Sequence, residues 1–291
     1  MHNSLFISSQ GSNIFVTIGA LDNLKNNIQT ITTWNVCGNA SLILFFKILG
    51  YTCEQTMKAI FELKIIVNTI NCSNLLPSNE IELIKYLQEW LMDKIEENQL
   101  FNKDVTLRDI YQQTNILPAY IVWCRNKNKI INLNALKYPD IKLIDATLST
   151  LTSLGFYTHY QIKNTIFTNI FSVDCYPYLY CLQQEDSNYL YLANLSDIND
   201  KIETNLGPMQ SQEIELIKQF CEHNNFRIEN ISKTIPNNLI KLYSILRRGE
   251  LSLETAIGLY KTGYQQGQAF GEGRDTRLAA QDYIDVINSQ S

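Results

Sequence analysis

The first fifty residues alternate between strand-like and helix-like hydrophobic patterns, and this alternation constrains the fold more than any other feature. Residues 5–7 form a short apolar run that stops at a cluster of turn formers, residues 8–13. Apolar residues then recur at helical spacing to about Asn26, and residues 28–36 are rich in β-branched side chains. A tight turn separates them from an apolar, helix-favouring run over residues 40–49. Such an alternation predicts a parallel sheet covered by helices.

The rest of the chain continues the mixed pattern. A helix starts at Ser78, and Thr106 with Asp109 has the spacing of a capping box that opens a short helix. The clearest strand covers residues 120–124. We expect further helices over residues 145–154, 213–221, 239–246, 253–270 and 276–287, and strands over residues 165–173 and 189–193. The pattern predicts one α/β domain over residues 1–270 and a tail over residues 271–291 that carries a short helix.

The composition narrows the class of protein. The 291 residues are 45% hydrophobic and 18% charged, which suffices for one large core. The net charge of -5 argues against a nucleic-acid partner, because phosphate binding needs a basic surface. We therefore expect no nucleic acid among the partners.

Targeting, membrane and metal signals are weak in this sequence. The N-terminus has no basic segment followed by an apolar stretch, and the apolar run over residues 42–49 is too short to span a bilayer. Seven cysteines without a C-x-x-C pair fit reduced thiols in an intracellular compartment. His2, His159 and His223 are too far apart in sequence for a local metal site. We expect no cofactor and no metal.

The segment from Asn35 to Ala40 has the layout of a nucleophile elbow. In such an elbow a strand ends in a sharp turn that leads directly into a helix, and the turn presents one side chain above the sheet. The helix N-terminus beside it favours developing negative charge. Small residues flank the nucleophile because the strand and the helix pack closely there. The layout predicts a reactive site at this turn.

The elbow and several other segments resemble the patatin-like phospholipase family, in degenerate form and with features of its viral and bacterial members. The elbow is similar to the family's G-T-S-A-G-A-L, and Gly50-Tyr51-Thr52 is similar to the segment that follows it. Further segments with a family-like pattern occur in the expected order, at residues 5–11, 18–21, 105–114, 138–146, 176–177 and 256–270. The resemblance implies a three-layer α/β sandwich with a mainly parallel central sheet.

The family works through a serine–aspartate dyad, and the resemblance places its functional positions on unusual residues here. Cys37 stands at the nucleophile position, and Asn169 stands at the position of the dyad aspartate. Asp174 is a second candidate for the acid if the motif is shifted. Neighbouring elbow positions are Asn35, Gly38 and Asn39, and the oxyanion-loop positions are Gln10, Gly11 and Ser12. A neutral amide such as Asn169 cannot accept the nucleophile's proton.

Three functions remain open at this stage. The first is a catalytically inactive patatin-like protein retained as a binding or structural component, intracellular or virion-associated. The second is an active lipid acyl hydrolase that uses Cys37 as a thiolate at a helix N-terminus. The third is a lipid-binding protein without turnover. Cys37 has a plainer interpretation as a small buried residue that fills the former serine position. The partners implied are a lipid or acyl chain, a partner protein, or a second copy of the chain.

Overall fold

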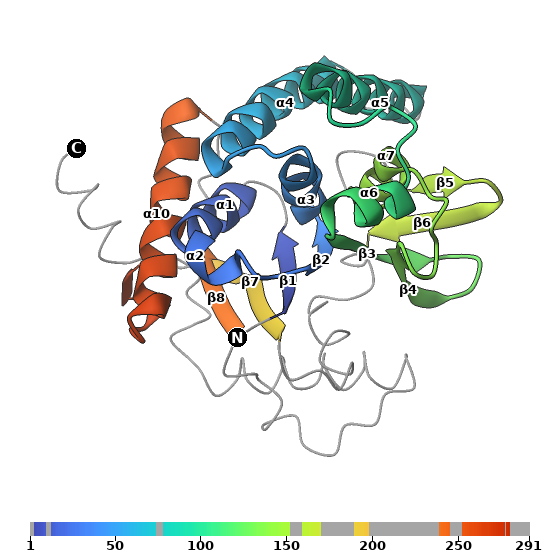
Figure 1. Cartoon of the computed structure of the whole chain (residues 1–291). Helices are drawn as coiled ribbons and strands as arrows, with labels where there is room; N and C mark the ends of the chain where they lie inside the picture. The colour runs from blue at the N-terminus through green and yellow to red at the C-terminus, as the bar shows by residue number, and fades with distance from the viewer. Residues whose placement is uncertain are drawn as a thin grey trace.

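The computed structural model of the chain describes residues 3–9, 13–73, 78–151, 159–169, 189–197, 239–244, 252–276 and 278–279. Within them a mixed sheet is overlaid by helices, and two long helices lie outermost (Figure 1). The strands are β1 (Ser4–Ser9), β2 (Thr33–Gly38), β3 (Leu117–Cys124), β4 (Lys129–Asn134), β5 (Tyr160–Ile162), β6 (Thr165–Asn169), β7 (Tyr189–Asp197) and β8 (Leu239–Ser244). The helices are α1 (Ile14–Asn23), α2 (Lys25–Ile28), α3 (Ala40–Ile48), α4 (Cys53–Ser73), α5 (Ser78–Asn98), α6 (Leu107–Thr114), α7 (Leu143–Thr150) and α10 (Leu253–Gly271).

The centre of the sheet is parallel. Strands β3, β2, β1, β7 and β8 are neighbours in this order, and each adjacent pair runs parallel. Strand β4 pairs antiparallel with one edge of β3. Strand β6 pairs antiparallel with the other edge, beyond the residues of β3 that pair with β2, and β5 pairs antiparallel with β6. Parallel strands in such a sheet are buried on both faces, which explains why β1 reads as a continuous apolar and small-residue run. The predicted mixed α/β fold with a mainly parallel sheet and flanking helices is confirmed.

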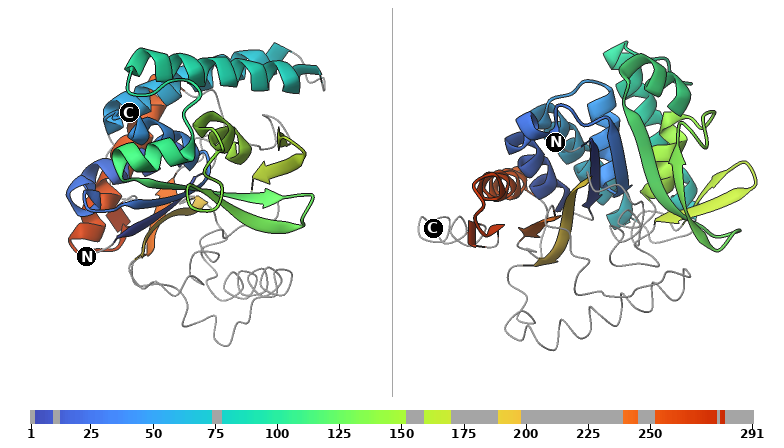
Figure 2. Two further views of the ribbon diagram at one scale, coloured as in Figure 1. Left: turned by 45° about the vertical axis from the view of Figure 1, so that its right-hand side comes forward. Right: turned by 60° about the horizontal axis from the view of Figure 1, so that its bottom comes forward.

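Helix α10 brings the C-terminal part of the chain against the N-terminal helix α1. Figure 2 shows the two helices side by side in both views. Glycines allow this close approach: a Cβ on Gly19 would overlap the carbonyl oxygen of Tyr260, and one on Gly263 would overlap that of Val16. The predicted helix over residues 253–270 is therefore confirmed as α10, and glycine spacing explains where it docks.

One predicted element is wrong, and another starts later than expected. Residues 239–246 were expected to be helical, but Leu239–Ser244 is strand β8, which pairs parallel with β7. Pairing with a neighbouring strand overrides the weak helical pattern of this short segment. Residues 28–36 were expected to form one strand, but Lys25–Ile28 continues the helical region as α2 and the strand starts only at Thr33.

Other elements are found with shifted ends. The capping box at Thr106 is present, with Asp109 as its third helical residue. The predicted helix over 145–154 is α7, which ends at Thr150, and the predicted strand over 165–173 is described to Asn169. The helix predicted over 213–221 and most of the tail helix over 276–287 lie outside the described residues. None of the described helices is long and apolar enough to cross a membrane.

Candidate functional site

The turn between β2 and α3 has the predicted strand–turn–helix layout. Strand β2 ends at Gly38 and α3 begins at Ala40, so only Asn39 lies between them. The backbone N–H of Asn39 donates to the carbonyl oxygen of Ser9 at 2.9 Å, which holds the turn against the end of β1. Gly38 has a φ of 61°, and it is therefore the residue of this turn in the left-handed conformation.

Cys37 lies one residue earlier, inside the strand. It is paired with Ser8 of β1, and its side chain is completely buried. The thiol donates a weak hydrogen bond to the carbonyl oxygen of Ile7, with Sγ 3.9 Å from that oxygen. The thiol thus occupies a position within the sheet and packs against its neighbouring strand.

Asn35 is the residue that the resemblance places at the family's first elbow glycine. Its side-chain amide forms hydrogen bonds with residues of other strands. Its Nδ2 lies 3.5 Å from the carbonyl oxygen of Leu5, and its Oδ1 accepts from Nδ2 of Asn132 at 3.3 Å. Asn132 in turn accepts from Asn134 at 3.2 Å. The amide of Asn35 therefore links β1, β2 and β4 on one face of the sheet, and its burial is compensated by these contacts.

The register brings Asn169 to the end of β2. Val122 of β3 pairs with β4 on one side and with Asn169 of β6 on the other. Because a strand has two edges, β6 lies along the edge of β3 opposite to β4. Tyr120 of β3 likewise pairs with β4 on one side and with Val36 of β2 on the other. Strand β2 therefore lies along the same edge of β3 as β6, and it pairs with residues of β3 that come two positions earlier. At about 3.3 Å per residue, Asn169 lies about 7 Å beyond Val36 along this edge. Asn169, the residue that the motif assigns to the dyad acid, therefore lies on the same edge of β3 as β2, beyond Val36.

Two buried hydroxyls near the turn were not predicted. Ser9 lies opposite Gly38 at the end of β1, and Ser41 lies in the first turn of α3. Both side chains are at most 1% exposed, and neither hydroxyl oxygen has a hydrogen-bond partner in the described part of the chain. The sequence held no signal for them, because a serine at a strand end or a helix start is common.

The remaining predicted site residues cannot be placed. Gln10, Gly11 and Ser12 of the oxyanion loop and the second candidate acid, Asp174, lie outside the described residues. Within the described ranges, no three His, Cys, Asp or Glu side chains gather in a way that could hold a metal ion. The observed site therefore consists of the β2–α3 turn, the buried Cys37 and the adjacent Asn169.

A mainly parallel sheet flanked by helices is the fold of patatin-like phospholipases. Among solved structures, VipD from Legionella pneumophila matches with a TM-score of 0.56 and 12% identity, over 94% of this chain and 67% of that one. At this identity the likeness concerns the fold alone.

Two structures of the type III effector ExoU match less well. One has a TM-score of 0.46 at 9% identity and covers 97% of this chain and 53% of that one. The other, the heterodimeric ExoU–SpcU complex of Pseudomonas aeruginosa, has a TM-score of 0.48 at 13% identity and covers 94% and 52%. The chain thus spans about half the length of the ExoU chains. No protein-family model and no curated protein matches the sequence.

Proposed function

We propose that this chain is a catalytically inactive protein with a patatin-like fold, retained as a binding or structural component. One observation carries the proposal. The strained position of a nucleophile elbow is where the reactive side chain projects, and here the left-handed residue at the turn is Gly38. Glycine has no side chain, so the turn presents no nucleophile at this point.

The burial of Cys37 supports the same proposal. A thiol attacks a substrate as the thiolate, and it must be reached by the carbonyl carbon. The side chain of Cys37 is 0% exposed, and its thiol donates to the Ile7 carbonyl, so a substrate carbonyl carbon does not reach the sulfur in this arrangement. A small buried residue that fills the strand interface is the interpretation that fits this environment.

Asn169 also supports the proposed inactivity, because it stands in place of the general base. The resemblance assigns the dyad carboxylate to this residue of β6, but an amide cannot accept a proton at neutral pH. Loss of general-base catalysis alone typically costs about 10²–10⁴ in rate. The proposal therefore rests on two positions in strands that both pair with β3: the β2 turn, where Gly38 presents no nucleophile, and Asn169 of β6 in place of the base.

The alternative is a lipid acyl hydrolase that uses Cys37. It is favoured by one specific feature, the position of this cysteine one residue before the turn and just ahead of the N-terminus of α3. A comparison of the unmodified protein with Cys37→Ala separates the two functions, with Cys124→Ala, another buried strand cysteine, as the matched control. Fatty-acid release lost only in Cys37→Ala would establish the alternative and overturn the proposal.

The retained role is proposed to be the binding of a lipid or a protein. Native mass spectrometry of the purified chain tests the first, because a bound acyl chain adds a defined mass that denaturation removes. Light scattering during size-exclusion chromatography tests a self-assembled form. If the chain is monomeric at high concentration and carries no lipid, the proposed role is binding of a different protein. Cross-linking would then identify that partner.

A further inference from the structure

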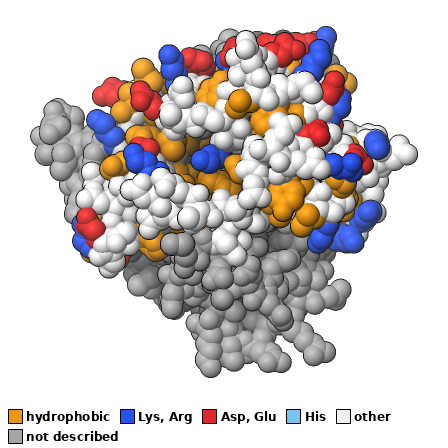
Figure 3. Space-filling model, viewed as in Figure 1, with side chains coloured by type: hydrophobic (Ala, Val, Ile, Leu, Met, Phe, Trp, Pro, Cys, Tyr) orange, Lys and Arg blue, Asp and Glu red, His pale blue; other side chains and the backbone are white. Residues whose placement is uncertain are grey.

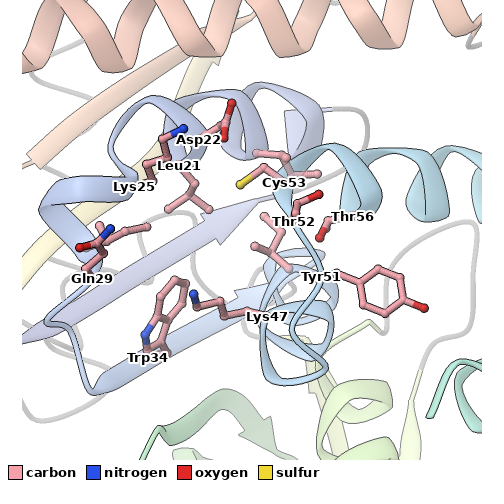
Figure 4. A pocket seen from close by; sticks show the side chains of 13 residues that line it. Leu21, Asp22, Lys25, Gln29, Trp34, Lys47, Tyr51, Thr52, Cys53 and Thr56 are labelled. Atoms are coloured by element: carbon pink, nitrogen blue, oxygen red, sulfur yellow. The ribbon is translucent and has the colours of Figure 1, made fainter. Parts of the chain in front are cut away.

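A cavity lies towards the C-terminal end of α3, away from the turn. Its volume is about 330 Å³, within the range of small-molecule sites, and it is bounded by α1, α2, the start of β2, the end of α3 and the start of α4 (Figure 4). In the space-filling view a hollow with hydrophobic walls and Lys or Arg side chains at its rim is visible in this region (Figure 3). The residues of α3 that line the cavity, Ile43 and Lys47, lie about 5 and 11 Å along the helix from Ala40, its first residue after the elbow.

The inner wall of the cavity is apolar. Trp34, at the start of β2, is 2% exposed, and its indole N–H is already satisfied by the carbonyl oxygen of Ile31 at 3.2 Å. Buried aliphatic side chains from the surrounding helices complete this wall: Ile18, Leu21, Ile28 and Ile43. An apolar group that entered the cavity would therefore leave water without displacing a hydrogen bond of the indole.

The rim is positively charged. Lys25 and Lys47 both line the cavity with exposed side chains, and the ammonium of Lys47 lies 5.8 Å from the centre of the Trp34 ring. Asp22 is the single carboxylate among the described lining residues, and it accepts a hydrogen bond from the hydroxyl of Tyr260 at 2.6 Å. The rim therefore carries two cations and one carboxylate, and this carboxylate already accepts a hydrogen bond from Tyr260.

The start of α4 adds to this positive character. Thr52 caps the helix reciprocally with Gln55: the Thr52 N–H donates to Gln55 Oε1 at 2.9 Å, and the Gln55 N–H donates to Thr52 Oγ1 at 3.2 Å. Thr52, Cys53 and Thr56 line the cavity, so the positive end of the helix dipole lies beside it (Figure 4). Burial, with Asp22 nearby, raises the pKa of the Cys53 thiol to about 11, so this side chain brings no negative charge at neutral pH.

We propose that this cavity binds a small amphipathic carboxylate. Its apolar body lies against Trp34 and the aliphatic wall, and its carboxylate lies at the rim near Lys25, Lys47 and the start of α4. The proposal goes beyond the function proposed above and does not depend on it, since the cavity lies at the far end of α3 from the turn. An elbow that proved active would leave it unchanged.

Binding of three ligands with the same tail and different heads tests the proposal. Decanoate, decanol and decyltrimethylammonium are titrated into the full chain below their micelle-forming concentrations, with calorimetry as the readout. We expect decanoate to bind about tenfold more tightly than decyltrimethylammonium, with decanol between them, because the two rim cations attract the carboxylate and repel the ammonium. Equal affinity for the anionic and cationic ligands, or no binding of decanoate, would overturn the proposal.

Two further measurements locate the bound carboxylate. Lys47→Met keeps the length of the side chain and removes its charge, and Lys58→Met, an exposed lysine of α4 that does not line the cavity, is the matched control. We expect Lys47→Met to weaken decanoate binding about two- to fivefold without changing decanol binding, and Lys58→Met to change neither. Decanoate should also slow maleimide modification of Cys53, mapped by peptide mass spectrometry. Binding that neither protects Cys53 nor responds to Lys47→Met would occur elsewhere and would refute the assignment.

Discussion

Gly38 determines what the β2–α3 turn can present, because its φ of 61° is a conformation that other residues adopt only at a cost. We predict that Gly38→Ala lowers the free energy of unfolding by about 1–2 kcal/mol. The control is Gly271→Ala at the end of α10, where an added Cβ meets nothing within 4 Å and φ is not positive. Urea denaturation measures both; a neutral Gly38→Ala would show that the turn relaxes easily.

Cys53 provides a test of the electrostatics around the cavity beside α3 and α4. Its raised pKa, about 11 against an ordinary 9.0, predicts a thiolate fraction at pH 8 about a hundredfold lower than that of an exposed cysteine. Alkylation of Cys53 should be correspondingly slow at pH 8 and accelerate towards pH 11, as followed by peptide mass spectrometry. A rate at pH 8 equal to that of a model peptide would contradict the burial of this thiol.

The same shift has a consequence for stability. Between about pH 9 and 11 the unfolded chain releases the Cys53 proton while the folded chain retains it. The contribution of this thiol is therefore fully present below pH 9 and is lost as the pH rises through this window. We expect Cys53→Ser, whose hydroxyl does not titrate there, to flatten the fall of the unfolding free energy between pH 9 and 11. Parallel slopes for the two proteins would exclude the shift.

The predictability of the site differs from residue to residue. The order of the motifs assigned the dyad acid to Asn169, and this assignment stays a prediction; the register shows that β6 meets the edge of β3 just beyond β2. The sequence did not indicate which residue of the turn takes the left-handed conformation. That depends on where pairing with β1 stops, and β2 pairs through Gly38. Cys37 therefore stays within the strand.

The contact between α1 and α10 depends on glycines, so a methyl group at the right position should loosen it. We predict that Gly263→Ala destabilises the fold by about 1–3 kcal/mol, because its Cβ would overlap the backbone of Val16. Gly258→Ala in the same helix meets nothing within 4 Å and should be stabilising by up to about 1 kcal/mol through helix propensity. The two variants should shift the urea midpoint in opposite directions, and shifts of the same sign would contradict this packing.

The capping box of α6 gives a prediction for a single helix. The Asp109 N–H donates to Thr106 Oγ1 at 3.3 Å, and the Asp109 carboxylate accepts from the Thr106 N–H at 2.9 Å. Thr106→Ala should cost about 1 kcal/mol, whereas Thr106→Ser, which keeps the hydroxyl, should cost much less. Thermal unfolding followed by circular dichroism compares the variants, and equal midpoints for them would exclude the cap as a stabilising feature.

Local sequence predicted elements well where a cap or a long apolar stripe was present, as in α5, α6 and α10. It failed for β8, because a six-residue segment carries too little periodicity to distinguish a helix from a strand. The pairing of β8 with β7, which decides the outcome, joins segments far apart in the chain. The hydropathy pattern of a short segment contains no information about which distant strand it will pair with.

At the scale of the molecule, α3 links two sites of different character. Its N-terminus follows a turn whose left-handed residue, Gly38, has no side chain, and its C-terminal end borders a cavity with an apolar wall and a cationic rim. The fold itself is shared with VipD at 12% identity, so the scaffold tolerates nearly complete replacement of its sequence. The cavity was not predicted, because its lining comes from segments that meet only in the folded chain.

The central claim, that the elbow performs no acyl transfer, is tested most directly by fatty-acid release from phosphatidylcholine vesicles. The assay uses the unmodified full chain at high protein concentration over many hours, with chromatographic detection of the released acid. We predict release equal to that from vesicles alone, because Gly38 presents no nucleophile and Asn169 cannot take up a proton. Release that rises with protein concentration and disappears in Cys37→Ala, but not in Cys124→Ala, would contradict the account.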